Sequence, residues 1–428
     1  MIRLSTADAS FARDFAALVD ARREADADVS RDVSTILRSV RDEGDAALKA
    51  FTLKLDRHDL DATGWRIEAA ACAHAFDTLE PGLRAALELA AARIRAYHEK
   101  QRPTDTAFTD DAGVRLGARW RAVDAAGIYV PGGRAAYPST LLMNAIPAKV
   151  AGVERLVVVT PTPDGHVNPL VLAAAHLAGA DEVWRIGGAQ AIAALAWGTD
   201  RIARVDVVTG PGNAWVAEAK RQVYGVVGID MVAGPSEIVV VADGANDPDW
   251  IAADLLSQAE HDVTTQSILF TDDHGFADRV VDAVERQIGT LATGETARIA
   301  WNANGAIVLV RDLAEAMPLV DALAPEHVEI AVDDPQPLFD LMRHAGSAFL
   351  GRHTPEAIGD YVAGPNHVLP TGRRARFASG LGVTDFMKRT SFLQLDAAAL
   401  GKLGPATVAL AEAEGLPAHA RSVALRLG

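Results

Sequence analysis

Apolar positions in the first hundred residues recur with the period of an α-helix. Two stretches carry this pattern, one within residues 33–51 and one that begins at Pro81. Proline fits the first turn of a helix, so Pro81 marks a helix start. Each stripe indicates a helix with one face packed on a core. The stripes are Val33, Ile36, Leu37, Val40, Ala47, Leu48 and Phe51, and then Leu83, Leu87, Ala90, Ile94 and Tyr97.

Farther along the chain the pattern becomes that of strands. Residues 114–120 alternate between apolar and other side chains, which predicts an exposed edge strand. From Gly127 onward, short β-branched runs alternate with helix-length segments, in two series. The expected strands are 126–130, 156–160, 182–186, 205–208 and 238–242, and then 267–270, 307–310, 328–331 and 348–350; helices are expected at 139–152, 213–224, 247–259, 277–288, 313–323, 336–344 and 396–414.

Repeated βαβ alternation predicts the fold class, because parallel strands need crossover helices that cover both faces of the sheet. We expect an α/β protein with two doubly wound, incomplete Rossmann-like parallel sheets, a small N-terminal helical extension and a C-terminal extension. The tail is too short for an ordinary domain, so it should pack on something larger, such as a partner subunit. The expected divisions are 1–30 (N-terminal extension), 31–126 with 237–380 (first α/β domain, with most candidate site residues), 127–236 (second α/β domain) and 381–428 (tail).

Composition narrows the class of protein. Of 428 residues, 49% are hydrophobic and the net charge is −16, so a globular chain is expected, and nucleic acid or an anionic membrane is disfavoured as a partner. The single cysteine, Cys72, excludes an intrachain disulfide and a multi-cysteine zinc site, and its Ala-rich setting favours a packing role over a nucleophile. The first residues lack the apolar segment of a signal peptide, and residues 186–197 are too few to span a bilayer. The cytoplasm is therefore expected.

A candidate metal site begins at Gln258 and His261, which share one face of an expected helix because they lie three residues apart. Such a pair is common in helices that bind nothing. Two other candidate ligands are Asp360, in a loop rich in glycine and proline, and His419, at a break after the tail helix. Together the four side chains form a nitrogen and oxygen ligand set that suits zinc, or a harder ion such as manganese.

Candidate acid/base residues are Glu326 and His327, at the entry to an expected strand. Adjacent side chains in extended structure point to opposite sides, so we expect them to serve different events. A surface glutamate beside a hydrogen-bonded core histidine is the plainer interpretation. His367, in the loop of residues 359–371, is a candidate for binding a polar substrate, and Glu414 stands near His419 at the tail break.

Three glycine-rich turns follow expected strands, at residues 129–133, 187–190 and 210–213. The last two lead straight into expected helices, and helix N-termini at strand carboxyl ends can face phosphates. A G-x-G-x-x-G fingerprint is absent, so nucleotide binding and ordinary strand-to-helix punctuation both stay open.

Long motifs, in order, resemble the histidinol dehydrogenase family. The resemblance extends from about residue 30 to residue 422, without departure at the matched functional positions. The motifs are GIYVPGG (127–133), GGAQAIAALAWGT (187–199), GPGNAWVAEAKRQV (210–223), AGPSEIVVVAD (233–243), SQAEHD (257–262), APEHVEI (324–330), GDYVAGPNHVLPT (359–371), GLGVTDFMKRTSF (380–392) and EGLPAH (414–419).

The resemblance implies a specific enzyme. Members oxidise L-histidinol to L-histidine, the last step of histidine biosynthesis, in two NAD-dependent steps through a bound histidinal. They are intertwined homodimers whose C-terminal tail reaches the other subunit's active site. It implies zinc at Gln258, His261, Asp360 and His419; acid/base catalysis by Glu326 and His327; substrate contacts from Ser236, His327, His367, Glu414 and the four zinc ligands; and NAD at Tyr129, Gln190 and Asn213, in the domain of residues 127–236.

Other functions remain in view. A relative that oxidises a different small polar alcohol would not need His367 and Glu414, which suit an imidazole and an amine. A zinc hydrolase could use Glu326 beside a metal-bound water, with unused nucleotide-like turns. A non-catalytic binding protein would be expected to lack Glu326 or His327, and both are present.

Overall fold

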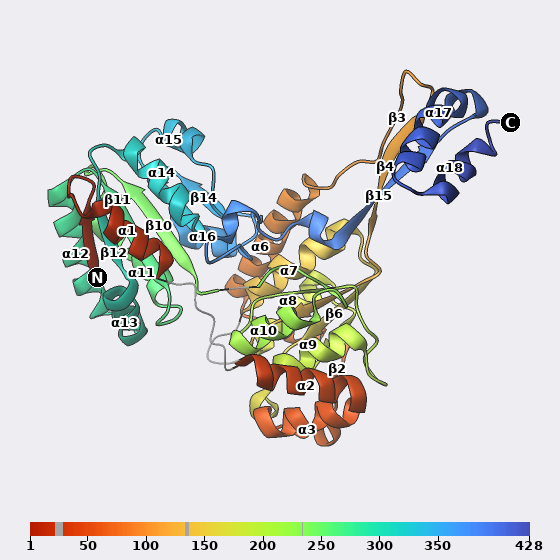
Figure 1. The fold of residues 1–428 in the computed structure, drawn as a ribbon. Coiled ribbons are helices and arrows are strands. Elements are labelled where there is room, and N and C mark those ends of the chain that lie inside the picture. Colours follow the sequence, from red (N-terminus) through yellow and green to blue (C-terminus); the bar gives the residue numbers. More distant parts are fainter. Residues whose placement is uncertain (22–28, 133–136, 233) are drawn as a thin grey trace.

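The computed structural model describes residues 1–21, 29–132, 137–232 and 234–428. Two α/β bodies lie side by side, and an arm projects from one of them (Figure 1). Each body is built on a six-stranded sheet, here called sheet I and sheet II, and the arm contains a three-stranded sheet. The predicted α/β class with two Rossmann-like units is confirmed.

Sheet I is parallel throughout, in the order β1-β12-β11-β10-β13-β14. Its central strands are fully buried, because helices cover both faces. The strands are β1 (Ile2–Ser5), β10 (Glu237–Ala242), β11 (Gln266–Thr271), β12 (Ala306–Leu309), β13 (His327–Ala331) and β14 (Ser347–Leu350). On one face pack α11 (Pro248–Ala259), α12 (His274–Ile288) and α13 (Gly294–Asn304), and on the other α1 (Phe11–Asp20) and α14 (Leu313–Leu323), with α15 (Gln336–Leu341) and α16 (Glu356–Tyr361) following.

Sheet II runs β2-β7-β6-β5-β8-β9, with only the edge strand β2 antiparallel to its neighbour. Its strands are β2 (Arg66–Ile67), β5 (Ala125–Tyr129), β6 (Arg155–Val159), β7 (Glu182–Trp184), β8 (Val207–Thr209) and β9 (Gly228–Ile229). One face carries α5 (Ala69–Asp77), α6 (Pro81–Glu99), α7 (Pro138–Ala151) and α8 (Pro169–Ala178); the other carries α2 (Val29–Glu43), α3 (Asp45–Asp56), α9 (Gly188–Trp197) and α10 (Ala214–Val223), with the short α4 (Leu60–Thr63) nearby.

Both sheets have a point at which the strand order reverses. In sheet II the chain passes from β5 outward to β6 and β7, and then returns to β8 on the other side of β5. In sheet I it passes from β10 to β11 and β12, and then returns to β13 beside β10. Open α/β sheets commonly bind ligands at such a reversal, outside the carboxyl ends of the strands.

The arm consists of β3 (Thr106–Thr109), β4 (Arg115–Ala122), β15 (Met387–Gln394), α17 (Ala397–Ala413) and α18 (Pro417–Ala424). β15 pairs antiparallel with β4 over eight residues, and β3 pairs with the other edge of β4. The segment expected to be an edge strand is therefore the central strand. Phe108, Leu393 and Leu410 stay more than 60% exposed, so the arm lacks a core of its own.

The expected domain boundaries differ from the observed packing. Residues 1–30 were assigned to a separate extension, but β1 extends sheet I beside β12, and α1 buries Phe15 and Leu18 on that sheet. Residues 31–126 were assigned to the same domain as 237–380, but the stripe of α2 packs on sheet II. A helical stripe shows that a face is buried, not which sheet buries it.

Candidate active site

Glu326 and His327 stand where the chain enters β13, at the amino end of sheet I. Both side chains reach the backbone of Glu237 on the neighbouring strand β10. Glu326 Oε2 accepts a hydrogen bond from the Glu237 N–H (3.0 Å), and His327 Nδ1 lies 3.1 Å from the Glu237 carbonyl oxygen. His327 Nδ1 and Glu326 Oε2 are 3.7 Å apart. The prediction that Glu326 and His327 point to opposite sides is wrong. Glu326 precedes β13, which begins at His327, so the side-chain alternation of a strand does not apply to it.

The hydrogen bond at Nδ1 fixes the form of the His327 ring. A carbonyl oxygen only accepts, so Nδ1 carries the proton, and Nε2 is left with a free lone pair. Burial lowers the pKa of His327 to about 4, against the opposing charge of Asp360. The imidazole is therefore neutral at pH 7, and its Nε2 is a competent proton acceptor.

The surroundings of Glu326 favour its neutral form in the ligand-free chain. Burial raises the pKa of this carboxyl well above its ordinary value, although the hydrogen bond from Glu237 opposes the shift. The nearby carboxylates of Glu237, Asp360 and Glu356 add to the rise. A cation that approaches the site would favour the ionised form.

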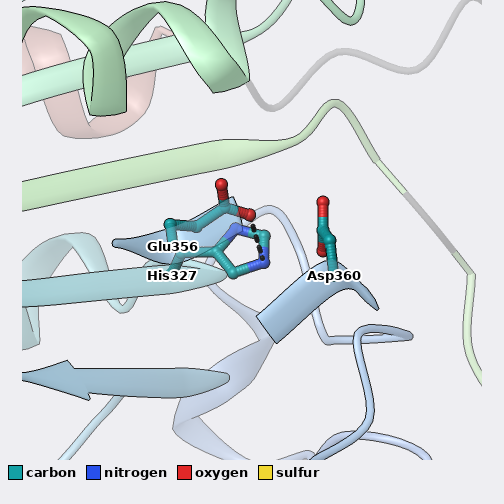
Figure 2. A group of neighbouring side chains, drawn as sticks. All are labelled: His327, Glu356 and Asp360. Carbon is teal, nitrogen blue, oxygen red and sulfur yellow. Dashed lines mark ion pairs between the residues drawn. The ribbon is translucent and has the colours of Figure 1, made fainter. Parts of the chain in front are cut away.

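A second pair of side chains comes from α16, where Glu356 and Asp360 lie one helical turn apart and face His327 (Figure 2). Glu356 Oε1 lies 3.6 Å from His327 Nε2. Within the described residues, the ligand atoms of His327, Glu356 and Asp360 all lie within 4.8 Å of one another. Burial pushes the pKa of Asp360 upward, but the hydrogen bond and charge of His367 outweigh it, so the net shift is downward.

Gln258 and His261 meet at the carboxyl end of α11, as their spacing predicts. Gln258 Nε2 lies 3.1 Å from His261 Nδ1. Gln258 is buried, its Oε1 has no hydrogen-bond partner among the described residues, and His261 is exposed. Burial raises the pKa of Asp360 and His367 lowers it. His261 lies close enough to lower it further, by a smaller amount.

His367 links the two bodies. Its Nδ1 lies 3.0 Å from the Asp360 carbonyl oxygen and 3.5 Å from Asp360 Oδ1. Its Nε2 lies 3.4 Å from Thr140 Oγ1 on α7, which packs on sheet II. Ser236, a predicted substrate contact, is half-buried just before β10. The amino edge of sheet I thus gathers most of the predicted site residues against the other body.

His419 and Glu414 are not brought to this cluster within one chain. Both are exposed on the arm, His419 in α18 and Glu414 at the end of α17. Figure 1 shows these helices well away from β14 and α16, which flank the cluster. A site that uses them needs the arm of another subunit.

A metal fits the residues that one chain does gather. An amide oxygen that is buried without a partner costs free energy, and a cation near Gln258 Oε1 would remove that cost. Gln258, His261 and Asp360 offer only oxygen and nitrogen donors, which suits the zinc or manganese expected from the sequence.

The predicted cofactor residues lie at the carboxyl edge of sheet II. Tyr129 ends β5, is buried, and its hydroxyl accepts a hydrogen bond from the Gly188 N–H (3.2 Å). Burial raises the pKa of Tyr129 to about 12. Gln190, in the first turns of α9, is buried, and its Oε1 lacks a partner among the described residues. Gly133, part of the first predicted turn, lies outside the described residues.

The turn after β8 completes this edge. Asn213 is exposed and caps α10, because its Oδ1 accepts from the N–H groups of Trp215 (3.1 Å) and Val216 (3.2 Å). Gly210 has φ +111°, and a Cβ there would lie 2.1 Å from the Tyr129 carbonyl oxygen. Only glycine allows β8 and β5 to end so close together, at the reversal of the strand order. The unpartnered Gln190 oxygen beside this reversal fits a polar ligand such as a dinucleotide.

Sequence reasoning missed the buried carboxyls behind His327. Ser257 Oγ donates to Glu356 Oε2 (3.1 Å), and burial raises the pKa of Glu356 to about 8. Glu329 on β13 shares a hydrogen bond with Asp254 on α11, and burial raises their pKa values to about 9 and about 6. Glu356 could have been found from its position one helical turn before Asp360.

Comparison with known proteins places this chain in a family. A family model described as histidinol dehydrogenase matches residues 19–427. The chain belongs to the histidinol dehydrogenase family. It is 62% identical to the histidinol dehydrogenase of Zymomonas mobilis over 427 residues, covering 100% of this chain and 99% of the relative. It is also 62% identical to that of Rhodospirillum rubrum, covering 100% and 98%.

A solved structure agrees. The crystal structure of histidinol dehydrogenase from Elizabethkingia anophelis matches with a TM-score of 0.94 at 34% identity, over 100% of this chain and 98% of that one. The family predicted from the motifs is confirmed, and so is the prediction of an enzyme of this oxidoreductase family. Within the described parts of the chain, no helix has the length and apolar composition needed to span a bilayer.

Proposed function

We propose that this enzyme oxidises L-histidinol to L-histidine in two sequential NAD-dependent steps, with histidinal held at the site between them. The observation that supports this most directly is His327, a buried neutral imidazole with a fixed Nδ1 proton. Its Nε2 faces the carboxyls of α16, next to the predicted metal ligands. The names of the relatives supply the substrate.

His327 is the base in this proposal. Its Nε2 takes the proton of the substrate hydroxyl as the carbinol carbon loses a hydride. It passes that proton to solvent and takes another when the hydrated aldehyde is oxidised. The free form of His327 predominates at pH 7, although its pKa of about 4 lies below the working pH, near which a general base is most effective. Such catalysis typically gives about 10²–10⁴-fold. The bond to the Glu237 carbonyl holds the ring in the required form.

Glu326 is the proposed activator of water for the second step. A carboxyl must be ionised to accept a proton from water, and the raised pKa of Glu326 opposes this in the ligand-free chain. A cation held at the neighbouring metal site would lower that pKa. Metal binding and ionisation of Glu326 are therefore coupled in this mechanism.

The proposed metal site combines Gln258, His261 and Asp360 of one subunit with His419 of the other. Zinc there would hold the amine and imidazole of the substrate, and positioning of this kind can contribute about 7–11 kcal/mol. The same four side chains, with Ser236, His327, His367 and Glu414, form the proposed substrate contacts. Glu414, exposed on the arm, would pair with a cationic group of the substrate through a charge-assisted bond.

The proposed NAD site is the carboxyl edge of sheet II, at Tyr129, Gln190 and Asn213. NAD supplies the hydride acceptor. The Gln190 amide oxygen, which has no partner in the part of the chain that the structure describes, could bond the cofactor, and Asn213 presents the N-terminus of α10. The proposed NAD domain consists of residues 127–236 together with the helices of residues 29–99, which pack on sheet II.

The proposed assembly is a cytoplasmic homodimer with exchanged arms. The arm exposes large apolar side chains, and it carries the two site residues that one chain keeps away from the cluster. Patches of this kind commonly mark protein interfaces. The compartment follows from the biosynthetic role of the family.

The decisive experiment measures NADH formation by the purified protein with L-histidinol, with zinc supplied. We expect two NADH for each histidine formed, and no accumulation of free histidinal. No turnover with L-histidinol would refute the proposal, and turnover with another small alcohol in its place would move the enzyme to a different substrate. Saturable NAD binding separates both from a hydrolase.

A further inference from the structure

A buried ion pair lies directly beneath the glycine turn after β8. Lys220 on α10 and Asp230, which follows β9, form an ion pair with only 3% and 1% of their side chains exposed. Taking two charges out of water costs several kcal/mol per ion, and apolar replacements are often as stable. The pair therefore invites an explanation other than stability.

The ion pair holds one peptide unit from both sides. Lys220 Nζ donates to the Gly210 carbonyl oxygen (3.0 Å), and the Gly210 N–H donates to Asp230 Oδ2 (2.9 Å). Asp230 is itself placed by its N–H, which donates to the Val208 carbonyl oxygen on β8. Gly210 stands at φ +111°, a conformation that glycine adopts readily, so the two hydrogen bonds rather than a side chain hold the peptide in place.

Gly210 in turn fixes its neighbours at the carboxyl edge of sheet II. It lies against the Tyr129 carbonyl, and Asn213 begins α10 three residues later. The Tyr129 hydroxyl reaches Gly188, at the start of the helix that carries Gln190. A shift of Gly210 would therefore disturb all three proposed NAD residues. Lys220 and Asp230 hold Gly210 in place, although both of their side chains are buried.

We propose that Lys220 and Asp230 are positioning residues for the NAD site: their ion pair holds Gly210 so that Tyr129, Gln190 and Asn213 keep the geometry that binds the cofactor. The inference rests on the proposed NAD site. It assigns the pair a role in cofactor affinity rather than in the chemistry at sheet I.

The test separates affinity from stability. The double variant Lys220→Met/Asp230→Leu removes both hydrogen bonds to Gly210 and leaves no unpaired buried charge. We expect some loss of melting temperature, because the Gly210 N–H and carbonyl oxygen lose their partners. The dissociation constant for NAD, measured by calorimetry, should rise at least about tenfold, which corresponds to the loss of about one hydrogen bond. The KM for NAD should rise with it. The kcat and the KM for L-histidinol should change little.

The chain offers a control pair of the same residue types that is more exposed, with side chains 22% and 44% accessible. Lys149 and Asp181 form a Lys–Asp pair (2.8 Å) at the amino edge of sheet II, where Asp181 also accepts from the Leu156 N–H (2.7 Å). Lys149→Met/Asp181→Leu removes the same groups from the opposite edge. We expect its NAD affinity to match wild type; an equal loss would mean that the effect is only structural, and would overturn the inference.

Two further measurements keep the test decisive. Asp230→Asn retains an acceptor for the Gly210 N–H, so its NAD affinity should fall between wild type and the double variant even if the double variant does not fold. Without NAD, the Gly210 amide hydrogen should exchange with solvent faster than in wild type in the double variant at Lys220 and Asp230 and in Asp230→Asn, provided that each folds. If wild type binds NAD and Asp230→Asn binds it equally well, the inference fails while the proposed function stands; if wild type binds none, both fail.

Discussion

The two bodies share one architecture but present their proposed sites at opposite edges. Sheet II gathers Tyr129, Gln190 and Gly210 at the carboxyl ends of its strands, where the strand order reverses. Sheet I gathers Glu326 and His327 at the amino ends. The usual location of ligands in open α/β sheets therefore holds for one body only.

The carboxyl edge of sheet I carries internal hydrogen bonds at its own reversal point. Arg352 bonds both oxygens of Asp243 (2.6 and 2.8 Å) and reaches Asp333 (2.7 Å). Asn246 donates to the Ala331 carbonyl oxygen (2.7 Å). Internal bonds occupy most of the polar groups at this edge, although Asn246 Oδ1, like Gln190 Oε1 at the edge of sheet II, has no hydrogen-bond partner among the described residues.

The edges also differ in electrostatics. The amino edge of sheet I holds buried carboxyls with raised pKa values, at Glu326, Glu356 and Glu329. The edge of sheet II presents glycines, an amide and a phenol, with a half-buried carboxyl, Asp56, close enough to raise the pKa of Tyr129. The first suits proton transfer and cations, and the second suits close approach of a large neutral or anionic ligand. If proton transfer belongs to the amino edge of sheet I and cofactor binding to the carboxyl edge of sheet II, variants at one edge should leave the function of the other intact.

The largest expected effect is that of His327→Asn. Loss of the base should lower kcat by about 10²–10⁴-fold, while zinc content and the dissociation constant for NAD stay at wild-type values. NADH formation at saturating substrates, metal analysis and calorimetry measure these quantities. Turnover within tenfold of wild type would remove His327 from the chemistry, and lost NAD affinity would break the division between edges.

His419→Gln should come next. Loss of a group that only supports a metal ligand already costs about 10–100-fold in metal affinity, so loss of a ligand should cost at least that much, with a matching loss of turnover in limiting zinc. Arg421→Gln, on the same exposed helix, is the control. Unchanged zinc affinity in His419→Gln would show that the arm supplies no ligand.

Gln190→Leu tests the other edge. Removing one buried hydrogen bond to the cofactor should raise the KM for NAD about tenfold. The kcat, zinc content and KM for L-histidinol should stay unchanged, because Gln190 lies on sheet II. Steady-state kinetics with each substrate varied in turn measures the split; a change confined to L-histidinol would contradict the assignment.

The smallest effect at neutral pH is expected for Glu329→Gln. The folded-state pKa of about 9 lies above the ordinary value of 4.5, so between these pH values the folded chain keeps a proton that the unfolded chain has lost. Stability therefore falls as pH rises through this range, by up to about 1.4 kcal/mol per pH unit. Glutamine removes that dependence and should change turnover at pH 7 little.

Thermal unfolding of wild type and Glu329→Gln between pH 5 and 8 measures this difference. The stability of the variant relative to wild type should grow as pH rises. Glu285→Gln, at an exposed glutamate on the same body, should show no such trend. A constant difference across the range would mean that Glu329 is ionised in the folded protein.

Local sequence pattern predicted the elements well where one face of a segment is apolar. The stripe of α2 follows directly from its periodicity. The start of α6 follows from Pro81, and the strands around Val239 and Val328, which are buried on both faces, follow from their short β-branched runs. β1 could not be predicted in this way, because its four residues pair with Ile307 and its neighbours, about three hundred positions away. Such pairing leaves no local signal.

The same limit applies to the site. The pairing of Gln258 with His261 follows from helical spacing, and the structure shows it. The shared bonds of Glu326 and His327 to Glu237 depend on the pairing of β13 with β10, which sequence does not specify. Glu356 lies one helical turn before Asp360, so the spacing indicates that the two share a face, but that this face meets His327 depends on where β13 lies.

The arm has a consequence for how active enzyme forms. Each body has its own core, so a chain diluted from denaturant can fold both sheets alone. The exposed leucines of the arm and His419 gain their proposed partners only when two folded chains meet. Recovery of activity on refolding should then be second-order in protein concentration and lag behind the return of helical signal.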